Sequence, residues 1–147
     1  MSHLTSLTTA AALAGTLILA ACGTPPTDLD LSLQQTSRQG KFMVGMVPPA
    51  NGPAINQMHV WQVRISTAGG LPISNARVGF DGGMPQHGHG FPTKPRVTRE
   101  ASQGVYVIEG VKFSMTGWWD MRLDIQSGDD ADTAIFNVIV DNDGIRR

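Results

Sequence analysis

Two segments of this chain alternate apolar and polar residues with a period of two, and this alternation constrains the fold more than any other feature. In the segment 59–65, one face carries His59, Trp61, Val63 and Ile65. In the segment 118–126, one face carries Trp119, Met121, Leu123 and Ile125. Successive side chains of a β-strand point to opposite faces, so each segment is predicted to be a strand with one buried face.

The rest of the chain after position 40 consists of short apolar stretches separated by Gly, Pro, Asn and Asp. We predict strands at 41–47, 57–66, 76–80, 96–100, 105–109, 111–115, 118–126 and 133–140. Seven or eight short strands, with turn residues about every 8 to 12 positions, are typical of a β-sandwich. The sequence therefore predicts an all-β, immunoglobulin-like antiparallel β-sandwich, with Trp61 as its buried tryptophan and no confident helix.

The N-terminal segment differs from the rest in composition, because all 11 Lys and Arg and all 12 Asp and Glu residues lie after position 27. Residues 10–21 are Ala, Leu, Ile, Gly and Thr only. Such a run is too short for a membrane span of roughly 20 residues, and it favours a signal peptide. It ends in Leu19-Ala20-Ala21-Cys22, which resembles the lipobox of bacterial lipoproteins. We predict that Cys22 is lipidated and becomes the first residue of an exported protein.

This interpretation divides the chain into three regions. They are a signal peptide at 1–21, a tether at 22–40 and a domain at 41–147. The tether is rich in Thr, Pro, Asp, Ser and Gln and is expected to let the domain stand away from the membrane, although Leu29, Leu31 and Leu33 alternate well enough for a short first strand.

The same interpretation predicts where the protein resides. A lipid-anchored protein belongs to the bacterial cell envelope and faces the periplasm or the outside. Gly23, rather than Asp, after the lipidated residue favours the outer membrane in a Gram-negative host. The formal net charge of -1 argues against a nucleic-acid binder, which is normally strongly basic on one face.

Candidate chemistry concentrates in the glycine-rich segment 82–90, which contains Met84, His87 and His89. Imidazole nitrogen together with thioether sulfur suits Cu(I), whereas imidazoles alone also suit Cu(II), Ni(II) or Zn(II). The only cysteine is in the lipobox, so no thiol competes for a metal. The spacing of the two histidines matches no standard zinc motif, and solvated histidines on a glycine-rich loop are the alternative interpretation.

The remaining methionines and the remaining histidine have simpler expectations. Methionine usually fills gaps in cores, and this is expected of Met43, Met46, Met58, Met115 and Met121. Met115 precedes a turn at 116–117, which would let it meet the loop of Met84 across one end of the sandwich. His59, on the apolar face with Trp61, is expected to be partly buried and hydrogen-bonded rather than a ligand.

Several of these segments together resemble a known family. The stretch Met84-Pro-Gln-His-Gly-His-Gly, then Gly104-Val-Tyr106, then Val111-Lys-Phe-Ser-Met115-Thr-Gly117-Trp118-Trp119 is similar to the YtkA-like or FixH-like domains of bacterial membrane and periplasmic proteins, as is the segment 71–78 before them. The resemblance covers roughly residues 41–140. It implies a small β-sandwich associated with copper handling, including cytochrome oxidase assembly. It also implies a partner among envelope copper proteins or oxidases, and a metal site made of Met84, His87, His89 and Met115.

Other functions fit the residues less well. Catalytic zinc usually has three protein ligands and a nearby general base, and Asp81 is the only acid adjacent to the loop. Nucleophile elbows and phosphate-binding fingerprints are absent from the sequence, so no enzyme is predicted. The acidic stretches 129–132 and 141–144 lack the distal Glu of a calcium loop and are expected to be turns. The alternative to copper binding is a metal-free interaction module that contacts a protein partner through the loop or Trp118.

Overall fold

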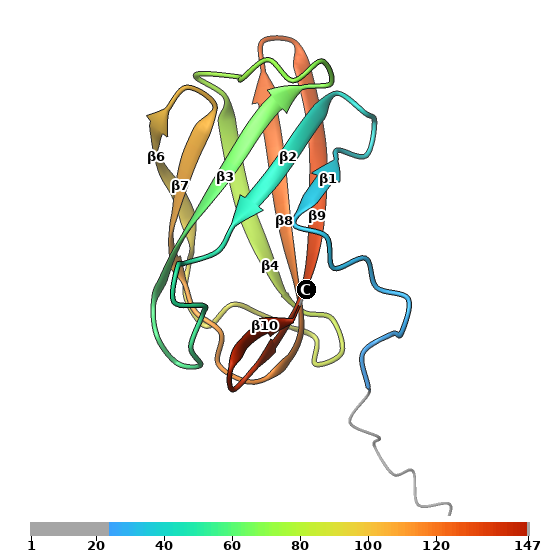
Figure 1. Cartoon of the computed structure of the whole chain (residues 1–147), viewed down its shortest axis with the longest axis vertical. Coiled ribbons are helices and arrows are strands. Elements are labelled where there is room, and N and C mark those ends of the chain that lie inside the picture. Colours follow the sequence, from blue (N-terminus) through green and yellow to red (C-terminus); the bar gives the residue numbers. More distant parts are fainter. Residues whose placement is uncertain (1–23, 147) are drawn as a thin grey trace, which may run out of the picture.

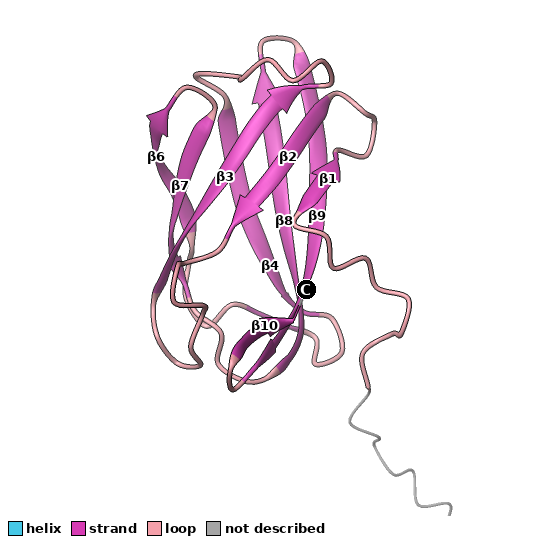
Figure 2. Cartoon of the chain, viewed as in Figure 1, coloured by secondary structure: helices cyan, strands magenta, loops and turns pink. Residues whose placement is uncertain are grey.

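The computed structural model describes residues 24–146, which form two antiparallel five-stranded sheets packed face to face (Figure 1). The first sheet has the order β1-β2-β3-β7-β6, with bounds Gln34–Thr36, Phe42–Val47, His59–Thr67, Val105–Val111 and Arg96–Ser102. The second has the order β10-β9-β8-β4-β5, with bounds Gly144–Arg146, Asp130–Asp141, Gly117–Ser127, Arg77–Met84 and His89–Gly90. The predicted all-β sandwich is confirmed. Figure 2 shows strands and loops throughout this part of the chain. Residues 24–146 include no helix that is long and apolar enough to cross a bilayer.

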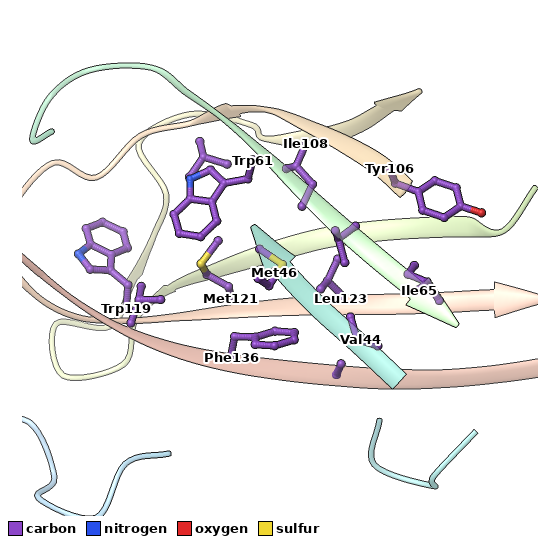
Figure 3. Close-up of a cluster of buried hydrophobic side chains, with 14 of the residues drawn as sticks. Val44, Met46, Trp61, Ile65, Tyr106, Ile108, Trp119, Met121, Leu123 and Phe136 are labelled. Carbon is purple, nitrogen blue, oxygen red and sulfur yellow. The ribbon is translucent and has the colours of Figure 1, made fainter. Parts of the chain in front are cut away.

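The core lies between the two sheets and is built from the alternating faces that the sequence predicts. Side chains of both sheets point into this layer, as Figure 3 shows for Trp61 and Ile108 from one sheet and Met121 and Phe136 from the other. The predicted inward face of β3 is buried from His59 to Ile65, and so is that of β8 from Trp119 to Ile125. Because one face of each strand is apolar and the other polar, stacking the sheets removes the apolar faces from water together.

The strand predictions differ from the structure in number and in one position. Residues 24–146 form ten strands rather than seven or eight, because β1, β5 and β10 are only two or three residues long and carry too few residues to alternate. The predicted strand at 111–115 is wrong, since β7 continues through Gly110 to Val111 and residues 112–116 form a loop. Phe113 in that loop is nevertheless fully buried, which explains the apolar pattern that suggested a strand.

The N-terminal part of the described chain is held against the domain. β1 lies within the segment expected to be a tether and pairs with β2. Before it, residues 24–33, which we name the strap, run along the sandwich toward one end (Figure 1). Leu29, Leu31 and Leu33 are each half-buried, so their alternation marks a side that faces the domain rather than a regular strand. The signal peptide at 1–21 and Cys22 lie outside the described residues.

The two ends of the sandwich are named here by their loops. The loop end, at the bottom of Figure 1, carries the segments 48–58, 85–88, 91–95, 112–116 and 142–143. The far end carries the segments 37–41, 68–76, 103–104 and 128–129. Of the two acidic stretches, 141–144 spans the tight β9–β10 turn as expected, whereas only Asp129 of the stretch 129–132 lies in the β8–β9 turn, because Asp130 to Asp132 begin β9.

Candidate functional site

The two histidines of the glycine-rich segment lie on a short hairpin at the loop end. β4 and β5 pair through Gly83 with Gly90 and Met84 with His89. Between them, the backbone amides of His87 and Gly88 both donate to the carbonyl oxygen of Met84, each at 3.0 Å. This tight turn leaves both histidine side chains exposed.

Glycine at position 83 allows the two strands of the hairpin to pack closely. A Cβ on Gly83 would collide with the carbonyl oxygen of His89 on the neighbouring strand. The amide of Gly83 also donates to Oδ1 of Asp120, on β8, at 2.8 Å. Asp120 therefore helps to fix the hairpin on the sheet, and sequence reasoning did not single it out. Asp120 lies on the polar face of β8 and pairs with Gly83 of β4. This pairing depends on the register of the two strands, which the sequence does not give.

His89 is oriented by a backbone hydrogen bond and by an aromatic contact. Its Nδ1 lies 3.0 Å from the carbonyl oxygen of Gly90. A carbonyl oxygen only accepts, so Nδ1 donates in this contact, and in the neutral ring Nε2 is the nitrogen with the lone pair. The ring also packs edge-on against Trp119, with centroids 5.8 Å apart. This is the arrangement in which a histidine offers Nε2 to a metal while its other nitrogen is held by the protein.

His87 and His89 lie close enough to share one ion. Their ring centroids are 5.9 Å apart and the rings are tilted by 32°. A metal about 2.0 Å from a ring nitrogen lies roughly 3.1 Å from the ring centroid, so two histidines on one ion have centroids about 5 to 6 Å apart. The observed separation fits this range.

Met84 is placed differently from the two histidines. Its side chain is buried, with 1% of its surface exposed, and it points into the sandwich beneath the hairpin. A Cβ on Gly117 would lie 2.8 Å from Cε of Met84, so this glycine makes room for the thioether. Met84 therefore connects the hairpin to the start of β8.

Met115 lies in the loop before β8 and is 41% exposed. Trp119 contacts both Met115 and the histidine hairpin. Its indole Nε1 donates to the carbonyl oxygen of Met115 at 3.2 Å, and its ring contacts His89. Trp119 also stacks on Phe91, with centroids 5.4 Å apart and an angle of 15° between the rings. The four residues named from the sequence thus converge on one end, around Trp119 and Gly117.

The other predictions for methionine and histidine have mixed outcomes. Met46 and Met121 are buried as expected, whereas Met43, Met58 and Met115 are exposed, because they sit on an outer strand face or in loops. His59 is buried, and its Nε2 lies 2.7 Å from the carbonyl oxygen of Ala54, as expected of a satisfied core histidine.

Trp118, the contact residue of the alternative hypothesis, is half-buried. Its Nε1 donates to Oδ1 of Asn137 at 3.0 Å. The polar end of its indole is therefore already engaged within the domain, so only part of the ring is open to a partner.

The hairpin borders an open pocket of about 330 Å³ on the outer face of the second sheet. Asp81, His89, Asp120 and Arg122 contribute its polar lining. Within residues 24–146, however, no three His, Cys, Asp or Glu side chains gather into a group that could hold a metal ion. A metal at this end must therefore take thioether or other ligands in addition to the histidine pair.

The sequence of this domain matches a known family model. The model describes YtkA-like proteins and matches residues 34–124, which is more than half of the chain. The chain belongs to the YtkA-like family. The match begins at β1 and includes the histidine hairpin and Met115, whereas the strap, β9 and β10 lie outside it.

A solved structure supports the fold of this YtkA-like domain. A DUF4426-family protein from Pseudomonas aeruginosa PAO1 is 20% identical, with a TM-score of 0.52, and the match covers 72% of this chain and 96% of that protein. The C-terminal domain of ZirS is 10% identical, with a TM-score of 0.42, over 93% of this chain and 84% of that domain. No curated protein matches the chain. At this identity the DUF4426 protein supports the fold alone.

Proposed function

We propose that this YtkA-like domain binds one copper ion at the loop end and delivers it to another protein of the bacterial cell envelope. The observation that carries the proposal is the histidine pair. Nδ1 of His89 is occupied by the carbonyl of Gly90, its Nε2 is free, and the ring of His87 lies at a separation suited to a shared ion. Both rings are exposed, so an incoming ion reaches them without opening the fold.

Thioether sulfur completes the proposed ligand set. Met115 is exposed and is linked to His89 through Trp119, so it is the first sulfur ligand. Met84 lies buried beneath the hairpin, so its sulfur reaches an ion only when the hairpin shifts. We therefore propose Met84 as the last of the four residues to bind. Two imidazoles with thioethers suit Cu(I), and the imidazole pair with oxygen ligands suits Cu(II), so both oxidation states belong in the test.

Lipidation of Cys22 completes the proposal. The lipobox-like segment and the resemblance to YtkA-like and FixH-like proteins support an exported protein anchored by its N-terminus, and Gly23 supports the outer membrane of a Gram-negative host. An anchored domain with an exposed ion site is suited to exchange with a neighbouring envelope copper protein or oxidase. Multiple acyl chains hold a protein on a bilayer stably, whereas one chain holds it weakly.

Copper titration of the purified mature protein tests the ligand assignment. We expect about one Cu(I) per chain in competition with a chromogenic chelator, and the same titration is repeated with Cu(II). His87→Ala combined with His89→Ala is expected to weaken binding by at least about 100-fold while the thermal unfolding midpoint stays within about 2 °C, because both side chains are exposed.

Methionine variants supply matched controls for that titration. Met115→Leu is expected to weaken Cu(I) binding by about tenfold, which is the scale of losing one ligand or its support. Met58→Leu changes another exposed methionine of the loop end and is expected to leave the affinity unchanged. Unchanged affinity in the double histidine variant would refute the site, and partner capture that depends on Trp118 in metal-free protein would favour the interaction module.

A further inference from the structure

We infer that the loop end of the sandwich lies against the lipid bilayer, so that the domain does not stand away from the membrane on a free tether. This inference rests on the lipid anchor of the proposed function, and it is independent of copper binding. It follows from where the chain enters the domain and from which surface surrounds that point.

The strap ends beside the histidine hairpin. Thr24 is the first described residue, and its carbonyl oxygen accepts a hydrogen bond from Nε2 of Gln86 at 2.6 Å. Gln86 lies in the turn between Met84 and His89. Two residues span at most about 7 Å, so the backbone of Cys22 is covalently limited to that distance from Thr24. The described chain thus reaches the hairpin only two residues after the proposed lipidation site.

The strap is fixed to the domain at two further points. Its residue Asp30 accepts a hydrogen bond through its carbonyl oxygen from Nδ2 of Asn137 at 3.2 Å. Its last residue, Leu33, accepts one from the amide of Met46 at 2.8 Å. Leu29 and Leu31 line a small pocket together with Ile139 of β9. Attachments to both sheets hold the strap along the sandwich, so it adds no free length between anchor and domain.

Hydrogen bonds of Asp30 also fix the strap locally, within itself and to β1. The carboxylate of Asp30 accepts hydrogen bonds from the side chain of Gln35 at 2.9 Å and from the amide of Ser32 at 2.8 Å. Both bonds lower the pKa of Asp30, the bond from Gln35 more than the bond from Ser32. Desolvation raises the pKa by a smaller amount. The carboxylate is thus in its ionised form at neutral pH, in which it accepts both bonds.

The loop end as a whole carries exposed apolar side chains. The chain has no Asp, Glu, Lys or Arg from Phe42 to Val63, a stretch that includes the loop 48–58. Within this stretch Met58 is 64% exposed and Val60 is 52% exposed. Met115, also at this end, is 41% exposed. These exposed side chains give the loop end apolar area that lipid can cover, and the adjacent anchor selects lipid rather than protein.

Charged groups at the loop end have both signs. Lys94 and Lys112 lie in its loops, and Asp141 and Asp143 lie at its β9–β10 turn. Attraction to anionic lipid is therefore not required, and the contact is expected with neutral phosphatidylcholine. The consequence for function is that the copper ligands face the membrane surface, so the protein that receives the ion is expected to be embedded in that membrane.

Fluorophores placed at opposite ends of the lipidated protein test this inference. With Cys22 lipidated, Met58→Cys gives a single thiol at the loop end for a nitrobenzoxadiazole label. Leu71→Cys gives the matched thiol at the far end, where Leu71 is 70% exposed. In phosphatidylcholine vesicles, spin-labelled lipid is expected to quench the label at position 58 by at least half and the label at position 71 by less than a tenth. Equal quenching at the two positions would overturn the inference.

A longer linker tests whether the short distance between anchor and domain, rather than a general affinity for lipid, holds the loop end at the membrane. Insertion of 20 Gly and Ser residues after Gly23 adds a coil with an end-to-end distance of about 25 Å. We expect quenching at position 58 to fall by at least half, because the domain is then free to turn. Full quenching despite the insertion would contradict the role of the short anchor. Mass spectrometry of the mature protein checks the acyl chains separately, and copper titration remains unaffected by either result.

Discussion

The two ends of the sandwich are held together in different ways. At the far end, side chains reach across loops and bond to backbone groups of other elements, through Ser37, Glu100, Tyr106 and Asp132. At the loop end, the exposed histidines make few bonds beyond their own hairpin. The far-end side chains are therefore tied into the fold, whereas the two exposed histidines of the loop end can vary at little cost in stability.

Asp132 is the main connection at the far end. Its carboxylate accepts hydrogen bonds from the hydroxyl of Ser37 and from the amides of Gln39 and Lys41. Burial raises the pKa of Asp132, but these hydrogen bonds outweigh burial and hold it below its usual range. The carboxylate thereby joins the turn after β1 to the start of β9.

The largest effect is expected from Asp132→Ala. Loss of a carboxylate that serves several donors leaves those donors unsatisfied, and the thermal unfolding midpoint is expected to fall by roughly 10 °C. Asp129→Ala, in the exposed β8–β9 turn, is the control and is expected to change the midpoint by less than about 2 °C. Differential scanning calorimetry measures both. Equal midpoints would show that the hydrogen bonds of Asp132 do not hold the far end together, while copper affinity is expected to be unchanged in both variants.

A smaller loss is expected from Tyr106→Phe. The hydroxyl of Tyr106 donates to the carbonyl oxygen of Ile73 at 2.7 Å and accepts from the amide of Ala76 at 2.9 Å. Removing it leaves the buried carbonyl of Ile73 and the partly buried amide of Ala76 unsatisfied, and it is expected to lower the free energy of unfolding by about 1.5 kcal/mol in urea denaturation. At the loop end, His87→Ala is expected to change the same quantity by less than about 0.5 kcal/mol. Similar losses in the two variants would remove the contrast between the ends.

The smallest effect concerns pH. The pKa of Glu100 is lowered by hydrogen bonds from the amides of Asn75 and Gly104, in the same direction as the pKa of Asp132. A carboxylate with a lowered pKa in the folded state binds fewer protons than in the unfolded state. Its stabilisation is complete above its unfolded pKa, near 4, and is lost as pH falls through the folded value.

We therefore expect the thermal unfolding midpoint to fall as pH is lowered from about 5 to 3, and to fall less steeply in Asp132→Asn. Circular dichroism at each pH measures the midpoint. The same slope in the variant and the native protein would mean that Asp132 does not contribute to the acid sensitivity.

Much of the core was predictable from the sequence because alternation with a period of two reports which face of a strand is buried. Trp61 and Trp119 were placed correctly on this basis. The strand predicted at 111–115 failed because Phe113 enters the core from a loop, and an alternating pattern does not distinguish a loop with one buried residue from a strand. The short strands β5 and β10 could not be predicted, because pairing with a neighbour defines them and their own residues do not.

The candidate site was predictable only in part. A Met and His segment rich in glycine was evident, but the sequence did not distinguish the buried Met84 from the exposed Met115. The tautomer of His89 depends on its bond to Gly90, and the role of Asp120 depends on the register of β4 with β8. The strap was expected to be a tether, since its polar composition gives no sign of the partners on β2, β9 and the hairpin that fix it.

The sequence by itself determined the class of fold, the faces of its longer strands and the residues available as ligands, because these follow from local periodicity and side-chain chemistry. Only the tertiary structure decided which of those residues share one end, which sulfur is accessible, and that the N-terminal strap enters beside the histidine hairpin. These are relations between segments up to 107 positions apart, such as Asp30 and Asn137. They are set by how the two sheets stack and pair, which the local pattern of any single segment does not contain.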